Sequence, residues 1–225
     1  MTGFLDRHAP NIPAEYSRYL DGDILGKILA KNLLLNVLGY SDDRIFIPLG
    51  RYGNADVKYA TPDKVLHDPG DGHVMHEDRK VTFEIKCARI NIANRSRGST
   101  QENWAFSNVR TTPKRVPKKY DVLIAVGLRT LGLEDERYWK YLEQVKALRA
   151  KQKRHFNVTS APHEASFLAT CSFFIMPMKE VPTNNFRLHV DAVDKGIYGK
   201  FRGWGDESER CRKLWRQAVD GSVEA

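Results

Sequence analysis

Cysteine is scarce in this chain of 225 residues, and no long hydrophobic run interrupts it. The cysteines, at positions 87, 171 and 211, are odd in number and far apart, which argues against a disulfide framework and favours a reducing compartment. The longest apolar runs, at 33–35 and 122–126, are far shorter than the roughly 20 residues that cross a bilayer. The N-terminus also lacks the basic and apolar segments of a secretory signal. We therefore expect a cytoplasmic protein with no membrane partner.

Two common ligand motifs are missing as well. No Cys-x-x-Cys pair occurs, and His67, His73, His76 and Cys87 match the spacing of no common zinc finger, so we expect these histidines to face solvent. The glycine-rich stretch at 198–205 lacks the Gly-Lys-Ser/Thr ending of a phosphate-binding loop and its strand-to-helix setting. The sequence therefore predicts neither a zinc site nor a phosphate-binding loop.

Positive charge is what the sequence has in excess. Lys and Arg number 36 against 28 Asp and Glu, which gives a formal net charge of +8. A positive protein favours a polyanionic partner, nucleic acid first, although many basic domains only have a solvated basic surface. The length and the 41% hydrophobic content fit one globular domain over residues 1–225.

Hydrophobic periodicity predicts an α+β domain built on one mixed sheet. Helices are expected over 21–38, which ends at Gly39, over 134–154, and over about 208–219. Extended segments are expected over 44–60, as two long strands over 56–86 around the turn Pro69–Gly72, and at 120–128, 171–178 and 186–193. The segment 89–120 is polar and basic, so we expect a long exposed excursion in which Trp104 and Phe106 pack into the core beneath it.

The stretch "VTFEIKCA" at 81–88 alternates as a strand does. Its apolar residues, from Val81 to Cys87, fall on one face, and Glu84 and Lys86 fall together on the other. Taken alone, Glu84 and Lys86 fit a surface ion pair worth well under about 1 kcal/mol. A catalytic interpretation requires a second carboxylate beside Glu84, since Mg²⁺ is commonly held by one or two carboxylates with water.

The expected hairpin selects that second acid. If it turns symmetrically around Pro69–Gly72, Asp56 lies opposite Ile85, between Glu84 and Lys86. Asp63 is the alternative, but it would lie about 20 Å along the strand from Glu84. Asp68 and Asp71 flank or occupy the turn, where Asp is expected for local reasons.

These segments, with "NADVKYA" at 54–60, "VTFEIK", "WAFSN" at 104–108 and "YDVLIAVGL" at 120–128, resemble the PD-(D/E)XK nuclease superfamily, most closely type II restriction endonucleases. The resemblance covers about residues 20–130. It implies an α/β/α core, a central mixed sheet flanked by helices, with Asp56 as the first acid and Glu84 and Lys86 as the E-x-K residues. Ala55 stands where the name-giving pattern has proline. The strands and helix of 165–220 would complete the sheet or contact DNA or a second subunit.

In this interpretation Asp56 and Glu84 bind Mg²⁺, and Lys86 orients the attacking water or stabilises the developing charge. A helix acid, one of Glu15, Asp21 and Asp23, is a further possible ligand. The resemblance also implies a homodimer and cleavage that leaves a 5′-phosphate.

The basic excursion supplies candidate contacts to double-stranded DNA. Arg, Asn and Gln side chains read base edges, and Lys and Arg suit phosphates. The candidates are Asn94, Arg95, Arg97, Gln101, Arg110, Lys114, Arg115, Lys118 and Lys119.

The leading hypothesis is therefore a Mg²⁺-dependent, sequence-specific DNA endonuclease of the restriction type. The nearest alternative is a repair, recombination or structure-specific nuclease with the same core. A third is a nucleic-acid-binding protein without catalysis, in which Glu84 and Lys86 form only a surface pair.

Overall fold

A computed structural model describes residues 22–48, 68–89, 91–94, 100–113, 115–128, 171–190, 196–205 and 207–221. The predicted first acid Asp56, its alternative Asp63 and the predicted helix over 134–154 lie outside these ranges. No helix in the described ranges is long and apolar enough to cross a membrane.

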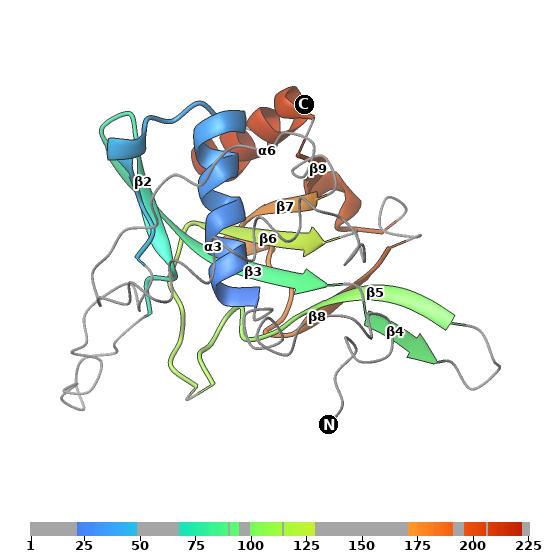
Figure 1. Cartoon of the computed structure of the whole chain (residues 1–225). Helices are drawn as coiled ribbons and strands as arrows, with labels where there is room; N and C mark the ends of the chain where they lie inside the picture. The colour runs from blue at the N-terminus through green and yellow to red at the C-terminus, as the bar shows by residue number, and fades with distance from the viewer. Residues whose placement is uncertain are drawn as a thin grey trace, which may run out of the picture.

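A six-stranded mixed sheet forms the centre of the molecule, in the order β1-β2-β3-β6-β7-β9 (Figure 1). Neighbours pair antiparallel except β3 and β6, which run parallel. This confirms the α+β class and the mixed sheet, and β6 is buried at every position, as its nearly continuous apolar sequence predicts. The strands are β1 (Ile45–Phe46), β2 (Gly72–His76), β3 (Arg79–Arg89), β6 (Val122–Leu128), β7 (Cys171–Pro177) and β9 (Arg202–Trp204).

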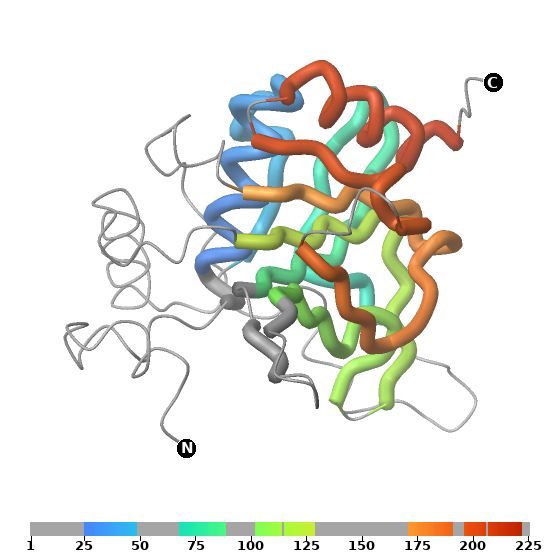
Figure 2. Tube along the Cα trace, turned by 90° about the vertical axis from the view of Figure 1, so that its right-hand side faces the viewer, coloured from blue at the N-terminus to red at the C-terminus, as the bar shows by residue number. Residues whose placement is uncertain are grey.

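Helices α3 (Gly22–Asn32) and α6 (Ser208–Asp220) pack on one face of this sheet and share its core. In α3, Leu25, Ile28 and Leu29 recur at helical spacing and are fully buried. The helix lies very close to β3, because a Cβ on Gly26 would come within 2.8 Å of Cys87 Cβ. A π-helical turn, η1 (Leu33–Val37), extends α3 to the N-terminal part of α6, and Figure 2 shows these distant segments side by side.

The opposite face of the large sheet is covered, in the described part of the chain, by a second sheet of three strands. The predicted α/β/α core, with helices on both faces of the sheet, is therefore wrong for the described residues, because strands cover the second face. Trp104 is fully buried against Phe174 and Gly127, which confirms its predicted place in the core. The second sheet consists of β4 (Asn91–Asn94), β5 (Thr100–Phe106) and β8 (Phe186–His189).

The segment 89–120 is accordingly not a simple exposed excursion. Its residues 91–94 and 100–106 pair as a hairpin, and β5 then pairs with β8, so that Phe106 lies opposite Phe186. The polar composition concealed these strands, because alternate positions of β5, Trp104 and Phe106, are enough to bury one face.

The predicted hairpin turn is also wrong. Strands β2 and β3 pair with His76 opposite Arg79 and Gly72 opposite Phe83, so the turn is Glu77–Asp78 and not Pro69–Gly72. Glu77 has φ 53°, a left-handed conformation that glycine or asparagine usually provides, so the sequence gives no turn signal there. The register that selected Asp56 is therefore not the register of the protein.

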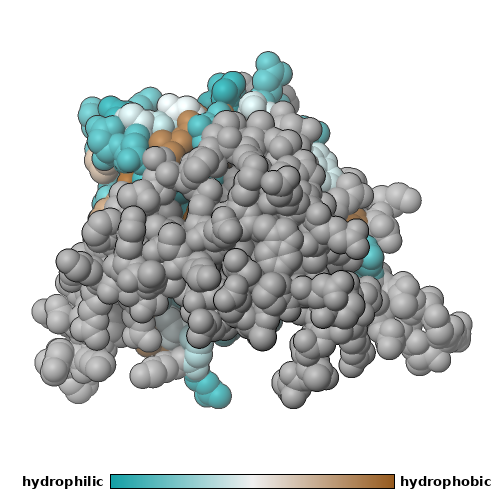
Figure 3. Space-filling view, in the orientation of Figure 1, coloured by the Kyte–Doolittle hydropathy of each residue, from teal (hydrophilic) through white to brown (hydrophobic). Residues whose placement is uncertain are grey.

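The described surface offers no extended apolar area. Ile197 is the one large hydrophobic side chain that is strongly exposed in the described ranges. At the top of Figure 3, most of the described residues at the surface are hydrophilic, and a small hydrophobic area lies among them.

Candidate active site

Strand β3 loses its neighbour β2 in the middle of the sheet, and Asp71 takes over the vacant hydrogen-bonding position. The last pair is Gly72 with Phe83. One residue earlier, the Asp71 amide donates to Phe83 O at 2.8 Å, and Asp71 Oδ2 accepts from the Ile85 amide at 2.8 Å. The side chain of Asp71 thus replaces a strand partner, and its carboxylate lies beside the backbone next to Glu84.

The loop before Asp71 requires glycine. Gly70 has φ +94°, and a Cβ there would lie 2.5 Å from Phe83 O, so no other residue permits this approach. Asp68 Oδ1 accepts from the Gly70 amide at 3.0 Å and holds the bend. The "PGDG" stretch, residues 69–72, is therefore a loop that brings Asp71 to β3, and we call it the crossing loop.

A second segment reaches the same place through backbone pairing. The Asp68 amide donates to Pro117 O at 2.9 Å, and the Lys119 amide donates to Asp68 O at 2.7 Å. Lys118, between these bonds, extends its side chain to Glu84 Oε1. Its side chain is only 8% exposed.

Glu84 lies at the centre of the site and is 1% exposed. Lys86 Nζ lies 2.7 Å from Glu84 Oε1, the oxygen that Lys118 also contacts. A surface ion pair does not describe this arrangement, because buried charges require partners and lose little of their interaction to solvent screening. Two carboxylates and two ammonium groups gather here, so their formal charges balance.

Burial and charge act against each other in this cluster. Burial and the negative charge of Asp71 raise the pKa of Glu84 to about 7, against the opposing effect of Lys86 and Lys118. Burial would lower the pKa of Lys86, but the charges of Glu84 and Asp71 outweigh it and the pKa is raised. Lys86 therefore stays protonated. Whether Glu84 carries its negative charge depends on the charged groups around it, because its pKa is raised to about 7.

Tyr120 lies near enough to the site for the charge of Glu84 to act on its hydroxyl. Its hydroxyl donates to Val109 O at 2.7 Å. Burial, followed by the negative charge of Glu84, raises the pKa of Tyr120, so the phenol stays neutral. It adds no charge to the Glu84 cluster.

The residues of the site fit a divalent cation that prefers oxygen. Glu84 Oε2 is buried and has no hydrogen-bond partner, whereas Oε1 receives both lysines. A buried carboxylate oxygen without a partner is rare unless it serves a ligand. Asp71 supplies a second carboxylate, and Mg²⁺ commonly needs only one or two with water. No group of three or more His, Cys, Asp or Glu residues gathers in the described part of the chain, which includes His73, His76 and Cys87.

The structure brings together Glu84 and Lys86 as predicted and adds Asp71 and Lys118. Asp71 was missed because the Asp of a Pro-Gly-Asp-Gly stretch has a sufficient local explanation. A two-residue turn at 77–78 would have placed Asp71 next to Glu84, but nothing in the sequence marks that turn. Helix α3, which contains the predicted Asp23, covers the opposite face of the sheet, and Glu15 and Asp21 lie outside the described residues.

The predicted DNA contacts divide into three groups. Arg115 and Lys119 are exposed on the segment that delivers Lys118, and Arg110 is half-buried with its Nε buried and without a partner. Lys118 belongs to the Glu84 cluster instead of an open surface. Asn94 and Gln101 lie on β4 and β5, but their side chains, and all of Arg95, Arg97 and Lys114, lie outside what the structure describes.

Comparison with known proteins gives no relative: no family model matches the chain, and neither a curated protein nor a solved structure matches it.

Proposed function

We propose that the protein is a Mg²⁺-dependent DNA endonuclease whose active site is Asp71, Glu84, Lys86 and Lys118. The observation that supports this most is the buried Glu84, which pairs one oxygen with two lysines and leaves the other without a partner beside a second carboxylate. Carboxylates and lysines close together, in a chain of net charge +8, match the needs of a phosphodiester substrate.

Each residue has a distinct part in hydrolysis. Asp71 and Glu84 would hold the metal ion through carboxylate oxygens. Mg²⁺, when bound, neutralises charge on a phosphate oxygen and lowers the pKa of water in its coordination shell. Lys86, fixed at 2.7 Å from Glu84, orients the attacking water or stabilises the charge that develops on phosphorus oxygens.

Lys118 has a second part, toward the substrate. With a cation held by Glu84, the Lys118 ammonium would lose part of its attraction to that carboxylate, and a DNA phosphate would offer it a new partner. Lys118 would then bind a phosphate oxygen of the bound strand. This assigns it the phosphate contact expected from the sequence, at the reacting phosphate and not at the rim.

The arrangement of the chain supports the resemblance to the PD-(D/E)XK superfamily. A helix, α3, is followed by the antiparallel β1, β2 and β3, and then by β6 parallel to β3. Glu84 and Lys86 lie on β3 as the E-x-K pair, and Asp71 stands in the place that the sequence assigned to Asp56. By the same resemblance we propose restriction-type cleavage of specific duplex sequences, by a homodimer.

Digestion of phage-sized duplex DNA with and without Mg²⁺ tests the proposal. The variants are Glu84→Gln and, as a matched control, Asp78→Asn, which changes an exposed acid in the β2–β3 turn. We expect discrete bands that require Mg²⁺, disappear with Glu84→Gln and persist with Asp78→Asn.

The other outcomes identify the alternatives. Cleavage only at branched or single-stranded substrates would indicate a structure-specific nuclease with this core. Binding with a steep salt dependence and no hydrolysis, in Mg²⁺ or Mn²⁺, would indicate a nucleic-acid-binding protein and would reject the nuclease.

A further inference from the structure

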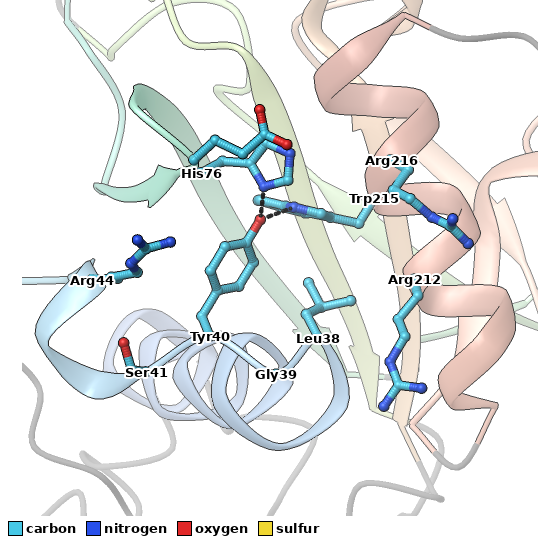
Figure 4. Close-up of a pocket in the computed structure, with 10 residues that line it drawn as sticks. Leu38, Gly39, Tyr40, Ser41, Arg44, His76, Arg212, Trp215 and Arg216 are labelled. Atoms are coloured by element: carbon cyan, nitrogen blue, oxygen red, sulfur yellow. Dashed lines mark hydrogen bonds between the residues drawn. The ribbon is translucent and has the colours of Figure 1, made fainter.

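A cavity of about 660 Å³ lies at the turn end of the β2–β3 hairpin, among residues that the proposed nuclease does not use. Its walls come from three parts of the chain: the segment after η1, the end of β2, and α6 (Figure 4). The cavity lies on the face of the large sheet that α3 and α6 cover, and Glu84 lies on the opposite face. A volume of this size is typical of sites for small molecules.

A chain of hydrogen bonds fixes one wall of the cavity. Trp215 Nε1 donates to Tyr40 Oη at 2.7 Å, and Tyr40 Oη lies 2.5 Å from His76 Nδ1. An indole can only donate, so the Tyr40 oxygen accepts from Trp215, and the same hydroxyl pairs with His76 Nδ1. His76 Nε2, on the other side of the imidazole ring, lies 3.6 Å from Asp220 Oδ1. Three rings from distant segments are therefore held in place before any ligand arrives.

Burial also raises the pKa of Tyr40, so its hydroxyl stays protonated. The Tyr40 ring is half-buried and meets Trp215 and His76 edge to face, with centroids 6.0 Å and 5.9 Å away. A partly exposed aromatic ring with a fixed orientation is a platform for another flat ring.

Three arginines surround this wall. Arg44 lies on one side of the cavity, and Arg212 and Arg216 lie one helical turn apart on α6 on the other (Figure 4). None of them forms an ion pair with a described residue, and Glu77 is the one acid among the described residues that line the cavity. Arg212 is oriented by a bond from its Nε to Val37 O at 2.8 Å.

This distribution of charge is unfavourable without a ligand. Like charges at i and i+4 of a helix repel each other, and Arg212 and Arg216 have that spacing on the rim of one cavity. A planar guanidinium binds phosphate through paired hydrogen bonds, so a multivalent phosphate would relieve the repulsion.

We propose that this cavity binds a nucleoside diphosphate or triphosphate, with the phosphates against the arginines that line it and the base against Tyr40. The volume exceeds what one phosphate group fills, and the aromatic wall beside the arginines suits a base. The site is separate from the Glu84 cluster, so it does not depend on the proposed nuclease activity.

Calorimetric titration of the full chain in EDTA, which keeps divalent cations out of the Glu84 site, tests this proposal. The probes are ADP, inorganic pyrophosphate, adenosine and a short DNA duplex. We expect ADP to bind several-fold more tightly than pyrophosphate and adenosine not to bind. Equal affinity for ADP and pyrophosphate would reject the role of the base. Tighter binding of adenosine than of pyrophosphate would reject the role of the arginines.

Variants locate the binding. Arg44→Gln with Arg216→Gln removes two exposed guanidinium groups that form no ion pair with a described residue, so the fold is retained. The matched control is Arg187→Gln, an exposed arginine on β8 in the other sheet. We expect the double variant to weaken ADP binding by about tenfold or more and the control to leave it unchanged.

Several results would overturn the inference. The first is that the wild-type chain does not bind ADP. The second is that the double variant and the control weaken ADP binding equally, which would indicate general charge attraction. The third is that the DNA duplex displaces ADP and binds the double variant as tightly as the wild-type chain.

Discussion

Asp71 Oδ2 accepts a hydrogen bond from the Ile85 amide at 2.8 Å, and this bond joins the crossing loop to the strand that contains Glu84. One carboxylate oxygen of Asp71 takes the place of the backbone carbonyl that a neighbouring strand would offer to the Ile85 amide. This bond to the backbone fixes the orientation of the Asp71 side chain, and no other side chain is needed for it. A carboxylate fixed in this way would be ready to share the proposed cation with Glu84.

Asp71→Asn is expected to abolish most cleavage while preserving the fold. The amide oxygen of Asn can still accept from Ile85, but the charge that would help to hold the proposed Mg²⁺ is lost. A loss of several kcal/mol in charge stabilisation corresponds to a rate about 10³-fold lower. Initial rates on a defined duplex, with circular dichroism as the check on folding, measure it.

Asp56→Asn is the comparison, because the sequence favours Asp56 as the first acid. A larger loss of activity in Asp56→Asn than in Asp71→Asn would move the first metal ligand to Asp56.

Lys118→Met is expected to separate metal binding from catalysis. Removal of one ammonium from Glu84 Oε1 makes the cluster more negative, so Ca²⁺, used as a non-cleaving probe, should bind more tightly to the free protein. Cleavage should nevertheless fall about 10²-fold because the reacting phosphate loses a cationic contact.

Lys119→Met is the matched control, since Lys119 is the exposed neighbour on the same segment. An equal change in Ca²⁺ affinity in both variants would show that only overall charge matters and would contradict the role of Lys118.

Gly70→Ala is expected to lower the free energy of unfolding by about 3 kcal/mol, since a methyl group would press on Phe83 O in addition to the cost of a positive φ. Gly39→Ala isolates the second cost, because Gly39 has φ +82° with nothing within 4 Å of its Cβ, and should lose only about 1 kcal/mol. Urea unfolding of both variants gives the comparison. Equal losses would mean that the loop does not press against β3.

Tyr40→Phe is expected to destabilise the fold by about 1–2 kcal/mol, because Trp215 Nε1 and His76 Nδ1 both lose their partner. Thermal or urea unfolding measures this. Tyr198→Phe is the control, since the Tyr198 ring packs against Phe186 and its hydroxyl has no hydrogen bond to a described residue. A similar loss in the control would show that the hydrogen-bond chain contributes nothing.

Local patterns in the sequence were enough to predict most of the elements of this fold. The apolar spacing of Leu25, Ile28 and Leu29 predicted α3, and the continuous apolar run of 122–128 predicted β6. The face of Glu84 followed from the alternation over 81–88, which the burial of Val81, Phe83 and Ile85 confirms. These features depend only on neighbours in the chain.

Features that depend on distant contacts were not predictable in the same way. The turn at Glu77–Asp78 has a backbone that its residues do not favour, so the pairing of β2 with β3 must stabilise it. Lys118 reaches Glu84 because residues 117–119 pair with Asp68, a contact between segments far apart in the sequence. The burial of Glu84 follows from these two pairings between distant segments. No local pattern in the sequence predicts it.

Whether Glu84 holds a catalytic divalent cation is best tested by the single-turnover rate of duplex cleavage as a function of Mg²⁺ concentration. We expect a saturable Mg²⁺ dependence in the wild-type protein and a rate at least about 10³-fold lower in folded Glu84→Gln at every concentration. No cleavage by the wild-type protein in Mg²⁺ or Mn²⁺, or an unchanged rate in Glu84→Gln, would reject a catalytic cation at Glu84.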